Sequence, residues 1–256
     1  MITWDPQVYL QAAGQRARPF LDLISRIAAG DPRGVVDLGC GPGNLTALLR
    51  QRWPRARLRA VDSSPEMVAA ALEAGIAAEL GDVTGWLPGP DDDVVVCNAV
   101  LQWVPGHAEL LQRWAVALRP DAWLAFQVPG NFAAPSHVLI REVAARRRWR
   151  PRLHGLLRDE HAVHPPAEYA ALLGDAGCEV DAWETTYLHR LTGPDPVLSW
   201  VTGTALRPVR TELDDAEWAA YTAELAPLLR AAYPPRPDGG TWFPFRRVFA
   251  VARRSE

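Results

Sequence analysis

A glycine-rich turn behind a short apolar run is the first feature of the chain that suggests chemistry. Residues 35–44 read VVDLGCGPGN, and the glycines are Gly39, Gly41 and Gly43. A dinucleotide-binding turn needs G-x-G-x-x-G, whose third glycine lets the following helix pack closely while its N-terminus faces a pyrophosphate. Asn44 stands where that third glycine belongs, and no G-K-[ST] follows to hold a triphosphate. The loop therefore does not match a phosphate-binding turn.

The acidic residue Asp37, two positions before the first glycine, also argues against a phosphate ligand. Its carboxylate would repel a bound pyrophosphate, whereas it suits a ligand that carries positive charge. S-adenosylmethionine has an ammonium and a sulfonium in addition to its carboxylate. The pattern therefore favours S-adenosylmethionine over a nicotinamide or a nucleoside triphosphate.

Polar residues also stand at the ends of the next expected strands. Asp62 ends the second strand, where its carboxylate would accept hydrogen bonds from both ribose hydroxyls, and Ser63 follows it. Asp82 ends the third strand and would accept from the adenine amino group, with the amide of Val83 facing a ring nitrogen. Asn98 ends the fourth strand and would face the methionine part of the ligand. Because open α/β sheets bind ligands beyond the carboxyl ends of their strands, these residues should line one crevice.

Trp103 and the cysteines are open to more than one interpretation. Trp103 would cover the adenine or the methionine part of the ligand, but the chain has 11 Trp, so plain packing is nearly as good an interpretation. Cys40, Cys97 and Cys178 are far apart, without CxxC spacing or a companion His cluster. They predict no zinc site and a reducing compartment, and Cys40 and Cys97 are interpreted as small buried side chains rather than nucleophiles.

The elements that would position these residues alternate between strand and helix. Ser64 is a plausible N-cap, Pro65 suits the first helical position and Gly75 suits a helix end. Strands alternating with helices indicate a parallel sheet that is covered on both faces. Strands are expected at 35–38, 56–62, 77–83, 92–100 and 122–128, with helices at 45–53, 64–75 and 108–120.

The second half of the chain is less regular and predicts a cap of helices over the sheet. It combines helical segments with a long strand at 179–191 and a final alternating strand at 241–254. We expect one domain, 1–256, with an N-terminal lid helix (1–30), a cofactor-binding core (31–130), a helical substrate cap (131–175 and 192–235) and the last two strands of a mostly parallel seven-stranded sheet (178–190 and 242–254).

Composition limits the classes of partner. The chain has 256 residues, 48% hydrophobic and 22% charged, as is ordinary for a soluble globular protein. Its net charge of -3 gives no global attraction to nucleic acid or an acidic membrane. The N-terminus has no leader-like pattern, and no apolar run approaches the ~18 residues of a membrane helix. We therefore expect a cytoplasmic monomer that acts on a small molecule, with no metal, nucleic acid or membrane partner.

The combined motifs resemble those of the class I S-adenosylmethionine-dependent methyltransferases, in which V-D-L-G-C-G-P-G, an acidic end of strand two and a later G-D recur. Other segments, most of them outside the cofactor motifs, are similar to segments of the trans-aconitate methyltransferase family. They include W-D-P-x-x-Y-L at 4–10, R-x-R-P at 16–19, L-Q-W-V-P-x-H at 101–107, P-S-H-V-L-I-R-E-V-A at 135–144, A-G-C-E-V-D-x-W-x-T-T-Y at 176–187 and T-x-L-R-P at 204–208. The chain departs from the family at Ala12 and Gln15, and the stretch 145–164 has no counterpart.

The resemblance implies a Rossmann-like α/β fold and transfer of a methyl group from S-adenosylmethionine to a carboxylate of trans-aconitate. The products would be the monomethyl ester and S-adenosylhomocysteine. A carboxylate is already ionised at pH 7, so attack on the methyl group needs no general base, and no catalytic residue is expected. A dry pocket that aligns the reacting atoms should supply most of the rate, with Arg side chains holding the other carboxylates.

The residues that the resemblance implies for substrate binding are few. His137 and Arg141 lie four apart and so share a helix face. Strand alternation turns only one of Arg246 and Arg247 inward, and the resemblance favours Arg247. For Tyr187 on the sixth strand, a packed core aromatic is an equal interpretation. The full set is Tyr9 and Arg16 on the N-terminal lid, His137, Arg141, Tyr187, Arg207 in the cap, and Arg247.

Three alternatives stay open. A methyltransferase for another small acid or amine would share the cofactor half of the chain and differ in the acceptor pocket. A nicotinamide reductase is opposed by the missing glycine and by Asp37. A noncatalytic cofactor-binding protein would have no need of buried Arg in a closed crevice.

Overall fold

The computed structural model describes residues 13–255, without the side chains of residues 13–16, and the described chain divides into two compact units. Unit 1 contains residues 130–163 and 186–246, and unit 2 contains residues 13–129, 164–185 and 247–255. All described strands before residue 130 belong to unit 2, as do the loops that follow them. The two long C-terminal strands contribute residues to both units.

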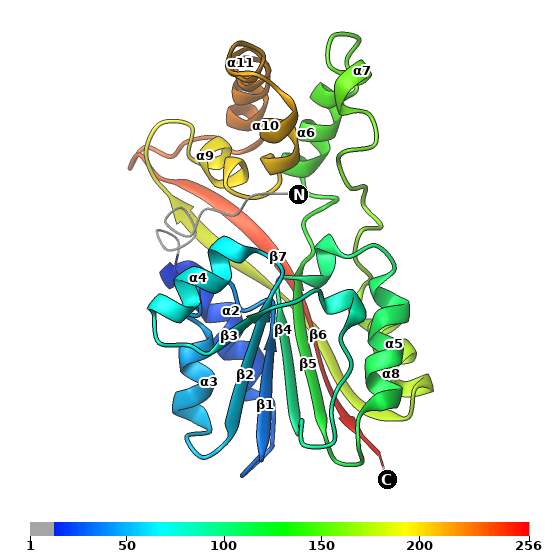
Figure 1. Ribbon diagram of the computed structural model, residues 1–256. Coiled ribbons are helices and arrows are strands. Elements are labelled where there is room, and N and C mark those ends of the chain that lie inside the picture. Colours follow the sequence, from blue (N-terminus) through cyan, green and yellow to red (C-terminus); the bar gives the residue numbers. More distant parts are fainter. Residues whose placement is uncertain (1–12, 256) are drawn as a thin grey trace. The chain divides into compact units, whose positions relative to one another are not determined.

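A seven-stranded sheet in the order β3-β2-β1-β4-β5-β7-β6 is the framework of the fold (Figure 1). The pairs β1 with β2, β1 with β4, β2 with β3 and β4 with β5 are parallel, and β5 with β7 is antiparallel. This confirms the mostly parallel sheet that the alternating pattern predicts. The strands are β1 (Gly34–Leu38), β2 (Arg57–Asp62), β3 (Ala78–Leu80), β4 (Val94–Asn98), β5 (Trp123–Pro129), β6 (Cys178–Leu191) and β7 (Thr241–Arg254).

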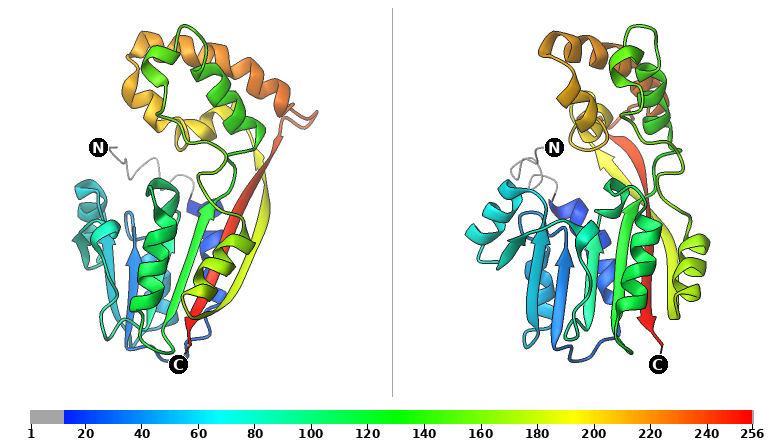
Figure 2. Two further views of the ribbon diagram at one scale, coloured as in Figure 1. Left: turned by 90° about the vertical axis from the view of Figure 1, so that its right-hand side faces the viewer. Right: turned by 45° about the vertical axis from the view of Figure 1, so that its right-hand side comes forward.

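Helices cover both sides of the sheet in unit 2. In Figure 1 and in the right-hand view of Figure 2, α3 and α4 lie at one side of the strands and α5 and α8 at the other. On β5, Phe126 meets Tyr169 of α8 edge to face, at 4.9 Å between ring centroids, and the adjacent Gln127 is also fully buried. Successive strand residues face opposite sides, so both faces of β5 are covered. The helices are α2 (Ala13–Ser25), α3 (Thr46–Arg52), α4 (Pro65–Glu73), α5 (His107–Ala117) and α8 (Pro166–Asp175), with 3-10 turns η1 (Val83–Gly85) and η2 (Leu101–Trp103).

The position of α8 differs from the sequence expectation, which puts residues 131–175 in the cap. The helix belongs to unit 2 instead. Its Tyr169 and Leu173 have no exposed surface, and the helix packs on α5. Burial of these two side chains four residues apart gives α8 an apolar stripe of the kind that covers a sheet.

The signals at the ends of α4 work as the sequence predicts. The Oγ of Ser64 accepts a hydrogen bond from the Met67 amide over 3.3 Å, and Pro65 occupies the first helical position. Gly75 follows the helix at a φ of 74°, a left-handed conformation that glycine adopts without strain. The cap places α4 directly after Asp62 and the end of β2.

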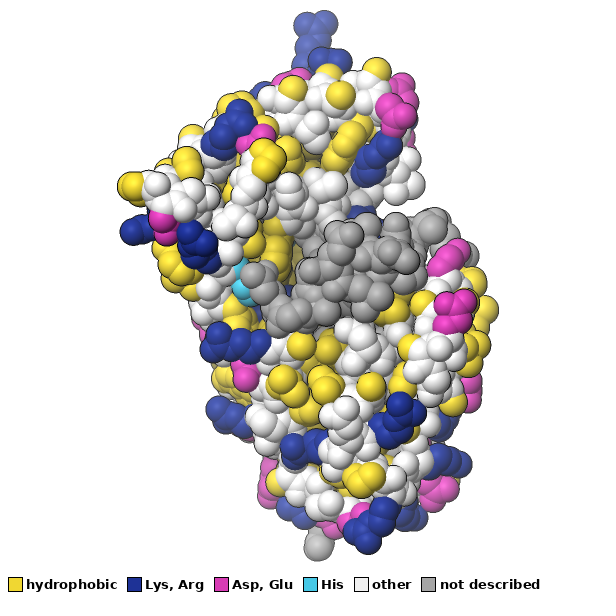
Figure 3. Space-filling view, turned by 90° about the vertical axis from the view of Figure 1, so that its left-hand side faces the viewer, with side chains coloured by type: hydrophobic (Ala, Val, Ile, Leu, Met, Phe, Trp, Pro, Cys, Tyr) yellow, Lys and Arg dark blue, Asp and Glu magenta, His cyan; other side chains and the backbone are white. Residues whose placement is uncertain are grey.

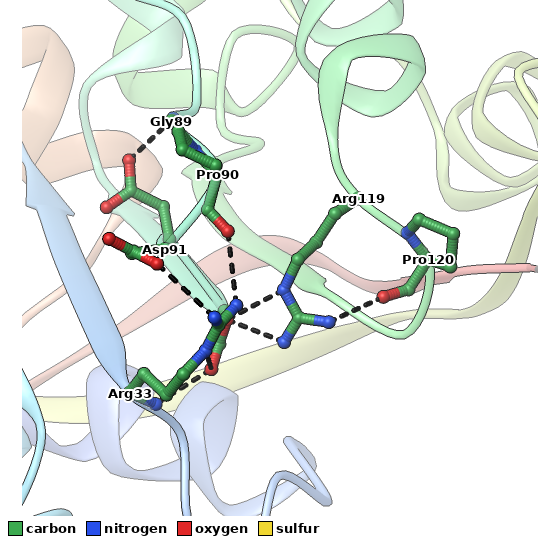
Figure 4. A network of polar contacts seen from close by, with 8 residues as sticks. Arg33, Gly89, Pro90, Asp91, Arg119 and Pro120 are labelled. Carbon is green, nitrogen blue, oxygen red and sulfur yellow. Dashed lines mark hydrogen bonds and ion pairs between the residues drawn. The ribbon is translucent and has the colours of Figure 1, made fainter.

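A carboxylate that the sequence analysis did not single out joins the amino ends of three strands, and Figure 4 shows the two arginines that it binds, Arg33 and Arg119. Asp93, just before β4, accepts hydrogen bonds of 2.5–3.3 Å from Arg33, before β1, and from Arg119, before β5. Burial acts to raise the pKa of Asp93, but the hydrogen bonds from both arginines outweigh it and hold the pKa below its ordinary value. The network fixes the edge of the sheet opposite to the predicted ligand site.

Unit 1 has a hydrophobic core of its own, built from five helices and parts of β6 and β7. Its first helix, α6, ends at Ala144, and a separate short helix begins at Arg150 with Pro151 in its first turn. Proline fits a first helical turn but not a helix interior. The buried Trp149 at this turn meets Tyr221 edge to face at 5.6 Å. The helices are α6 (Pro135–Ala144), α7 (Arg150–Leu153), α9 (Pro196–Thr202), α10 (Arg207–Glu212) and α11 (Asp215–Ala232).

Charged side chains of both signs are mixed on the surface. On the face shown in Figure 3, Arg side chains are scattered among acidic ones and do not gather in one patch. Many Arg side chains of unit 1 pair with carboxylates, as Arg152 does with Glu212 and Glu217. No helix within residues 13–255 combines the length and the apolarity that crossing a membrane requires.

Candidate functional site

The candidate site lies at the carboxyl ends of β1 and β4, where the strand order of the sheet reverses. From β1 the chain continues to β2 on one side, whereas β4 lies on the other side. Loops that follow two such strands diverge and leave a crevice between them, which is the usual ligand position in open α/β sheets. The glycine loop follows β1, and Asn98 is the last residue of β4.

Each glycine of the loop has a positive φ, with values of 75°, 57° and 80° for Gly39, Gly41 and Gly43. Gly39 also needs space, because a Cβ there would lie 2.1 Å from Cγ2 of Val100. At Gly43 a Cβ would lie 2.8 Å from Cγ1 of Ile76. A Cβ on Gly41 would meet nothing within 4 Å. Two glycines therefore allow close packing, while Gly41 borders open space.

The backbone amides of the loop are directed into the fold. Gly39 and Cys40 both donate to the Val61 carbonyl, over 2.7 and 3.1 Å. The Gly41 amide donates to Oδ2 of Asp62 over 2.8 Å. A loop that binds phosphate instead presents its amides to the ligand. The geometry agrees with the sequence argument that this loop does not hold a phosphate.

Asp62 ends β2, as predicted, and its carboxylate faces the glycine loop. Oδ2 accepts from Gly41 and Oδ1 accepts from the Ser64 amide over 2.9 Å. Burial raises the pKa of Asp62, and backbone hydrogen bonds from Ser64, Gly41 and Ser63 oppose that rise. After the bonds from the Gly41 and Ser64 amides, each carboxylate oxygen has a further lone pair. Asp62 is therefore a positioned acceptor, while the adjacent Ser63 is exposed.

Asp37 lies behind the loop rather than in front of it. Its side chain is 3% exposed, and Oδ2 accepts a hydrogen bond of 2.6 Å from Oγ1 of Thr46 in α3. Burial raises the pKa of Asp37 to about 6, with Thr46 opposing the rise and Asp62 adding to it. Asp37 fixes the start of α3 and places negative charge beneath the loop.

Asp82 lies beyond the third strand, which ends at Leu80, and it starts the turn η1. Its Oδ1 accepts from both the amide and the hydroxyl of Thr84, each over 2.8 Å, and these bonds lower the pKa of Asp82. The following Val83 is buried, whereas Asp82 itself is exposed. The sequence predicted Asp82 at the end of the third strand, whereas the structure has it two residues beyond that end, as the N-cap of η1.

Two amide oxygens at the end of β4 are buried and lack partners among the described residues. They are Oδ1 of Asn98 and Oε1 of Gln102. The amide nitrogen of Gln102 donates to the Ala99 carbonyl over 2.6 Å, so the amide oxygen is the atom of this side chain that lacks a partner. Ala99 has a φ of 58°, a strained value for a residue other than glycine. Trp103 follows in η2 and is partly exposed.

Gln102 is not among the site residues predicted from the sequence. Its signal in the sequence is position alone, four residues after Asn98 at a strand end. Its unpartnered oxygen becomes evident only when the tight turn around Ala99 is known. Together with Asn98 it offers acceptors to a ligand that donates hydrogen bonds, such as an ammonium.

Unit 1 brings together His137 and Arg141 on one face of α6, as their spacing predicts. Nη1 of Arg141 donates to the carbonyls of Phe132 and Arg158, over 2.7 and 3.4 Å. The His137 ring lies edge to face with Phe132, with centroids 5.5 Å apart. Burial, aided by the Arg141 charge, lowers the pKa of His137 to about 4, so the imidazole is neutral at pH 7. The pair therefore combines one cation with one neutral polar ring.

The other predicted substrate residues are distributed over both units. Tyr187 on β6 is 3% exposed and stacks on His189, and Arg207 begins α10. Both belong to unit 1, whereas Arg247 belongs to unit 2. Tyr9 lies outside the described residues, and Arg16 lies in α2 without a described side chain.

Alternation along β7 turns Arg247 inward, as predicted. Arg247 is 8% exposed, and Arg246 is less buried. The strand begins at Thr241, so Arg247 lies in its middle. Its Nη1 donates to Oε1 of Gln127 on β5 over 2.9 Å. The sequence argument did not foresee this partner.

Comparison with known proteins places the chain in a family. A methyltransferase domain model matches residues 12–182. The chain is 62% identical to a protein of Mycobacterium sp. strain KMS named trans-aconitate 2-methyltransferase, over 98% of this chain and 99% of that protein. Proteins of the same name from Rhodococcus jostii strain RHA1 and Mycobacterium tuberculosis are 60% and 56% identical, over 98% and 97% of this chain and 99% and 96% of their own lengths.

Solved structures resemble the fold at low sequence identity. The YcgJ protein of Bacillus subtilis has a TM-score of 0.59 at 14% identity, over 93% of this chain and 99% of that one. Phosphoethanolamine N-methyltransferase 2 of Haemonchus contortus, in complex with S-adenosyl-L-methionine, has a TM-score of 0.56 at 14% identity, over 98% of this chain and 57% of that one. These likenesses show a class I, Rossmann-like methyltransferase fold. The chain belongs to the methyltransferase-domain family and, within it, to the family of the proteins named trans-aconitate 2-methyltransferase.

Proposed function

We propose that the protein transfers a methyl group from S-adenosylmethionine to a carboxylate of trans-aconitate and releases the monomethyl ester and S-adenosylhomocysteine. The observation that carries this proposal is the 56–62% identity to relatives of that name over 97–98% of the chain. The match extends beyond the methyltransferase domain, which ends at residue 182, into the helices of unit 1. Sequence similarity thus includes the segments that hold most of the predicted substrate residues.

The residues at the carboxyl ends of the strands fit S-adenosylmethionine. Asp62 offers oriented carboxylate oxygens to ribose hydroxyls, and Gly41 borders open space without a side chain. The unpartnered oxygens of Asn98 and Gln102 suit the ammonium group, and the buried charge of Asp37 favours a cationic ligand. We assign Ser63, Asp82, Val83 and Trp103 to the same cofactor set, with Asp82 and Val83 near the adenine.

The reaction needs an ionised acid and an aligned methyl group rather than a proton acceptor. When bound, S-adenosylmethionine supplies an electrophilic methyl group that a carboxylate oxygen takes by displacement at carbon. The acid is ionised at pH 7, so no side chain has to remove a proton. Burial raises the pKa values of the Cys40 and Cys97 thiols, which keeps them protonated. The protein's contribution is to orient the acid and to exclude water.

We infer that unit 1 serves as the substrate cap expected from its sequence. Arg141 supplies a fixed cation, and His137 is neutral and so adds polarity without charge. Arg207 and Tyr187 belong to the same unit. Carboxylates are best held by guanidinium groups, which stay charged and donate through two parallel N–H groups. Tyr9, Arg16 and Arg247 complete the proposed substrate set.

The proposal also includes a cytoplasmic monomer whose partner is a small acid, without nucleic acid or membrane. Three free, buried cysteines among the described residues agree with a reducing compartment. On the face shown in Figure 3 the charges are mixed, so that face does not favour a polyanion. Sedimentation at several concentrations tests the monomer, and a stable dimer would contradict it.

The decisive experiment is a methyl-transfer assay with labelled S-adenosylmethionine and product identification by mass. Trans-aconitate, cis-aconitate, citrate and isocitrate are compared as acceptors under the same conditions. We expect a monomethyl ester that forms fastest from trans-aconitate. If the cofactor binds and none of these acids is methylated, the chain is a methyltransferase for another small molecule.

A further inference from the structure

A buried glutamine on β5 is a polar group that the proposed function leaves without a role. Gln127 has no exposed surface and lies two residues before the carboxyl end of its strand at Pro129. Its Cα partner on β4 is Asn98. Paired residues of neighbouring strands point to the same face, so Gln127 and Asn98 share one face near the carboxyl edge of the sheet.

Arg247 fixes the direction of the Gln127 side chain. Nη1 of Arg247 donates to Oε1 of Gln127 over 2.9 Å, and both residues are buried. A guanidinium only donates hydrogen bonds, so the atom that it contacts is the amide oxygen. The amide nitrogen of Gln127 must then point away from Arg247.

The amide nitrogen of Gln127 lacks an acceptor among the residues that the structure describes. Oδ1 of Asn98 on the same face is also without a partner, so these two side chains do not satisfy each other. A buried donor without an acceptor destabilises a fold, and an apolar side chain of similar size would remove that penalty. A glutamine at this position therefore indicates that a ligand atom accepts its hydrogen bond.

The charge beside the amide selects the class of ligand. The guanidinium of Arg247 favours an anion, and a carboxylate oxygen is a strong acceptor for an amide N–H group. We infer that Nε2 of Gln127 binds a carboxylate of the acid substrate, which makes Gln127 a further specificity-determining residue of the reaction. The inference rests on the proposed function. The carboxylate of the methyl donor has the same chemistry, and the experiment must separate the two sources.

The test compares the wild-type protein with Gln127→Leu and with the control Gln112→Leu, which removes an exposed glutamine of α5. Three quantities are measured: the KM for trans-aconitate, its calorimetric Kd in the presence of S-adenosylhomocysteine, and the Kd of S-adenosylhomocysteine itself. We expect Gln127→Leu to raise KM and Kd for the acid by roughly tenfold or more. The Kd of S-adenosylhomocysteine should stay within about twofold, and Gln112→Leu should match wild type.

Several results would overturn the inference. One is unchanged acid binding in Gln127→Leu. Another is weaker binding of S-adenosylhomocysteine with unchanged binding of 5′-methylthioadenosine, since this would assign the amide to the carboxylate of the donor. A parallel loss of both ligands together with a lowered Tm would indicate a purely structural role.

A second variant covers a failure of Gln127→Leu to fold. Gln127→Glu keeps an oxygen for Arg247 and places a negative charge where the amide nitrogen was. It should therefore weaken the binding of trans-aconitate more than the binding of S-adenosylhomocysteine. Acid binding equal to wild type in this variant would refute the inference. Absence of ester with the wild-type enzyme would refute the proposed function alone, because the calorimetric comparison needs no turnover. A wild-type chain that binds no trans-aconitate would refute both.

Discussion

The geometry of Asp62 provides the most direct test of the proposed cofactor site. Its two carboxylate oxygens are held by the amides of Gly41 and Ser64. Hydrogen bonds between ligand hydroxyls and a charged group contribute about 1.5–3 kcal/mol each. We expect Asp62→Ala to raise the calorimetric Kd of S-adenosylhomocysteine by roughly 10-fold to 100-fold. An affinity within about twofold of wild type would remove Asp62 from the cofactor set.

Asp37 should affect stability and ligand binding in opposite directions. Folding raises the pKa of Asp37 from 3.8 to about 6, so the folded state favours the protonated acid. The corresponding stability is present below about pH 4 and is lost as the pH rises through 6. Asp37→Asn keeps an acceptor for Thr46 and removes the charge. We expect this variant to be at least as stable as wild type in urea at pH 7.5, and to bind S-adenosylmethionine more weakly.

The pH dependence of the stability difference between Asp37→Asn and wild type serves as the control for this prediction. The stability difference between Asp37→Asn and wild type should shrink as the pH falls from 7.5 towards 4, because Asp37 becomes neutral. A difference that stays constant over this range would show that the effect does not come from the ionisation of Asp37.

The pKa of His137 is a second property of a single residue that can be tested. Its pKa is lowered from 6.5 to about 4, first by burial and then by the charge of Arg141. The neutral ring therefore supports folding above pH 6.5, and that support is lost as the pH falls through about 4. NMR titration, assigned with His137→Gln, should show a pKa near 4 that rises in Arg141→Gln. A pKa above 6 would contradict the combined effect of the partly buried position of the ring and the neighbouring Arg141 charge.

At the scale of elements, the glycine loop depends on its packing against the segment after β4. Gly39→Ala places a Cβ against Val100 at a positive φ, and we expect a loss of about 2–4 kcal/mol in urea unfolding. Gly39→Ala with Val100→Ala should recover part of this loss, with a coupling of about 1 kcal/mol or more. Strict additivity of the two changes would show that the clash is not the cause.

The order of elements in unit 2 follows from local sequence, while the pairings within it do not. The cap at Ser64, the end of α4 at Gly75 and the polar end of β2 at Asp62 were predictable because each signal lies within a few residues. The partners Arg247 and Gln127 are 120 residues apart, and Asp93 meets Arg33 across 60 residues. Pairing at that distance is decided by strand order, which periodicity does not reveal.

The candidate site shows the same limit. Strand ends located Asp62 and Asn98, but the unpartnered oxygen of Gln102 depends on the turn at Ala99. Burial of Asp37 behind the loop was also hidden, because a sequence gives the spacing of a residue and not the direction of its side chain. A boundary inside a helical run, as at Ala144, depends on the packing of Trp149 and on Pro151.

At the scale of the whole molecule, the proposed roles divide between the two units. Every described residue of the proposed cofactor set belongs to unit 2, and unit 1 has His137, Arg141, Tyr187 and Arg207 together with its own hydrophobic core. A ligand that binds only the folded state stabilises it by about 2.7 kcal/mol at 100 times its Kd. That stabilisation should be concentrated in the segments that contact the ligand.

Hydrogen exchange followed by mass spectrometry therefore should separate the two ligands. With S-adenosylhomocysteine alone, we expect added protection in the loop 39–43 and in residues 62–64 of unit 2, with little change in α6. Addition of trans-aconitate should then protect α6 and α10, because these helices hold Arg141 and Arg207. Protection of α6 by S-adenosylhomocysteine alone, with no further change on adding the acid, would assign this helix to the cofactor and contradict the proposed division.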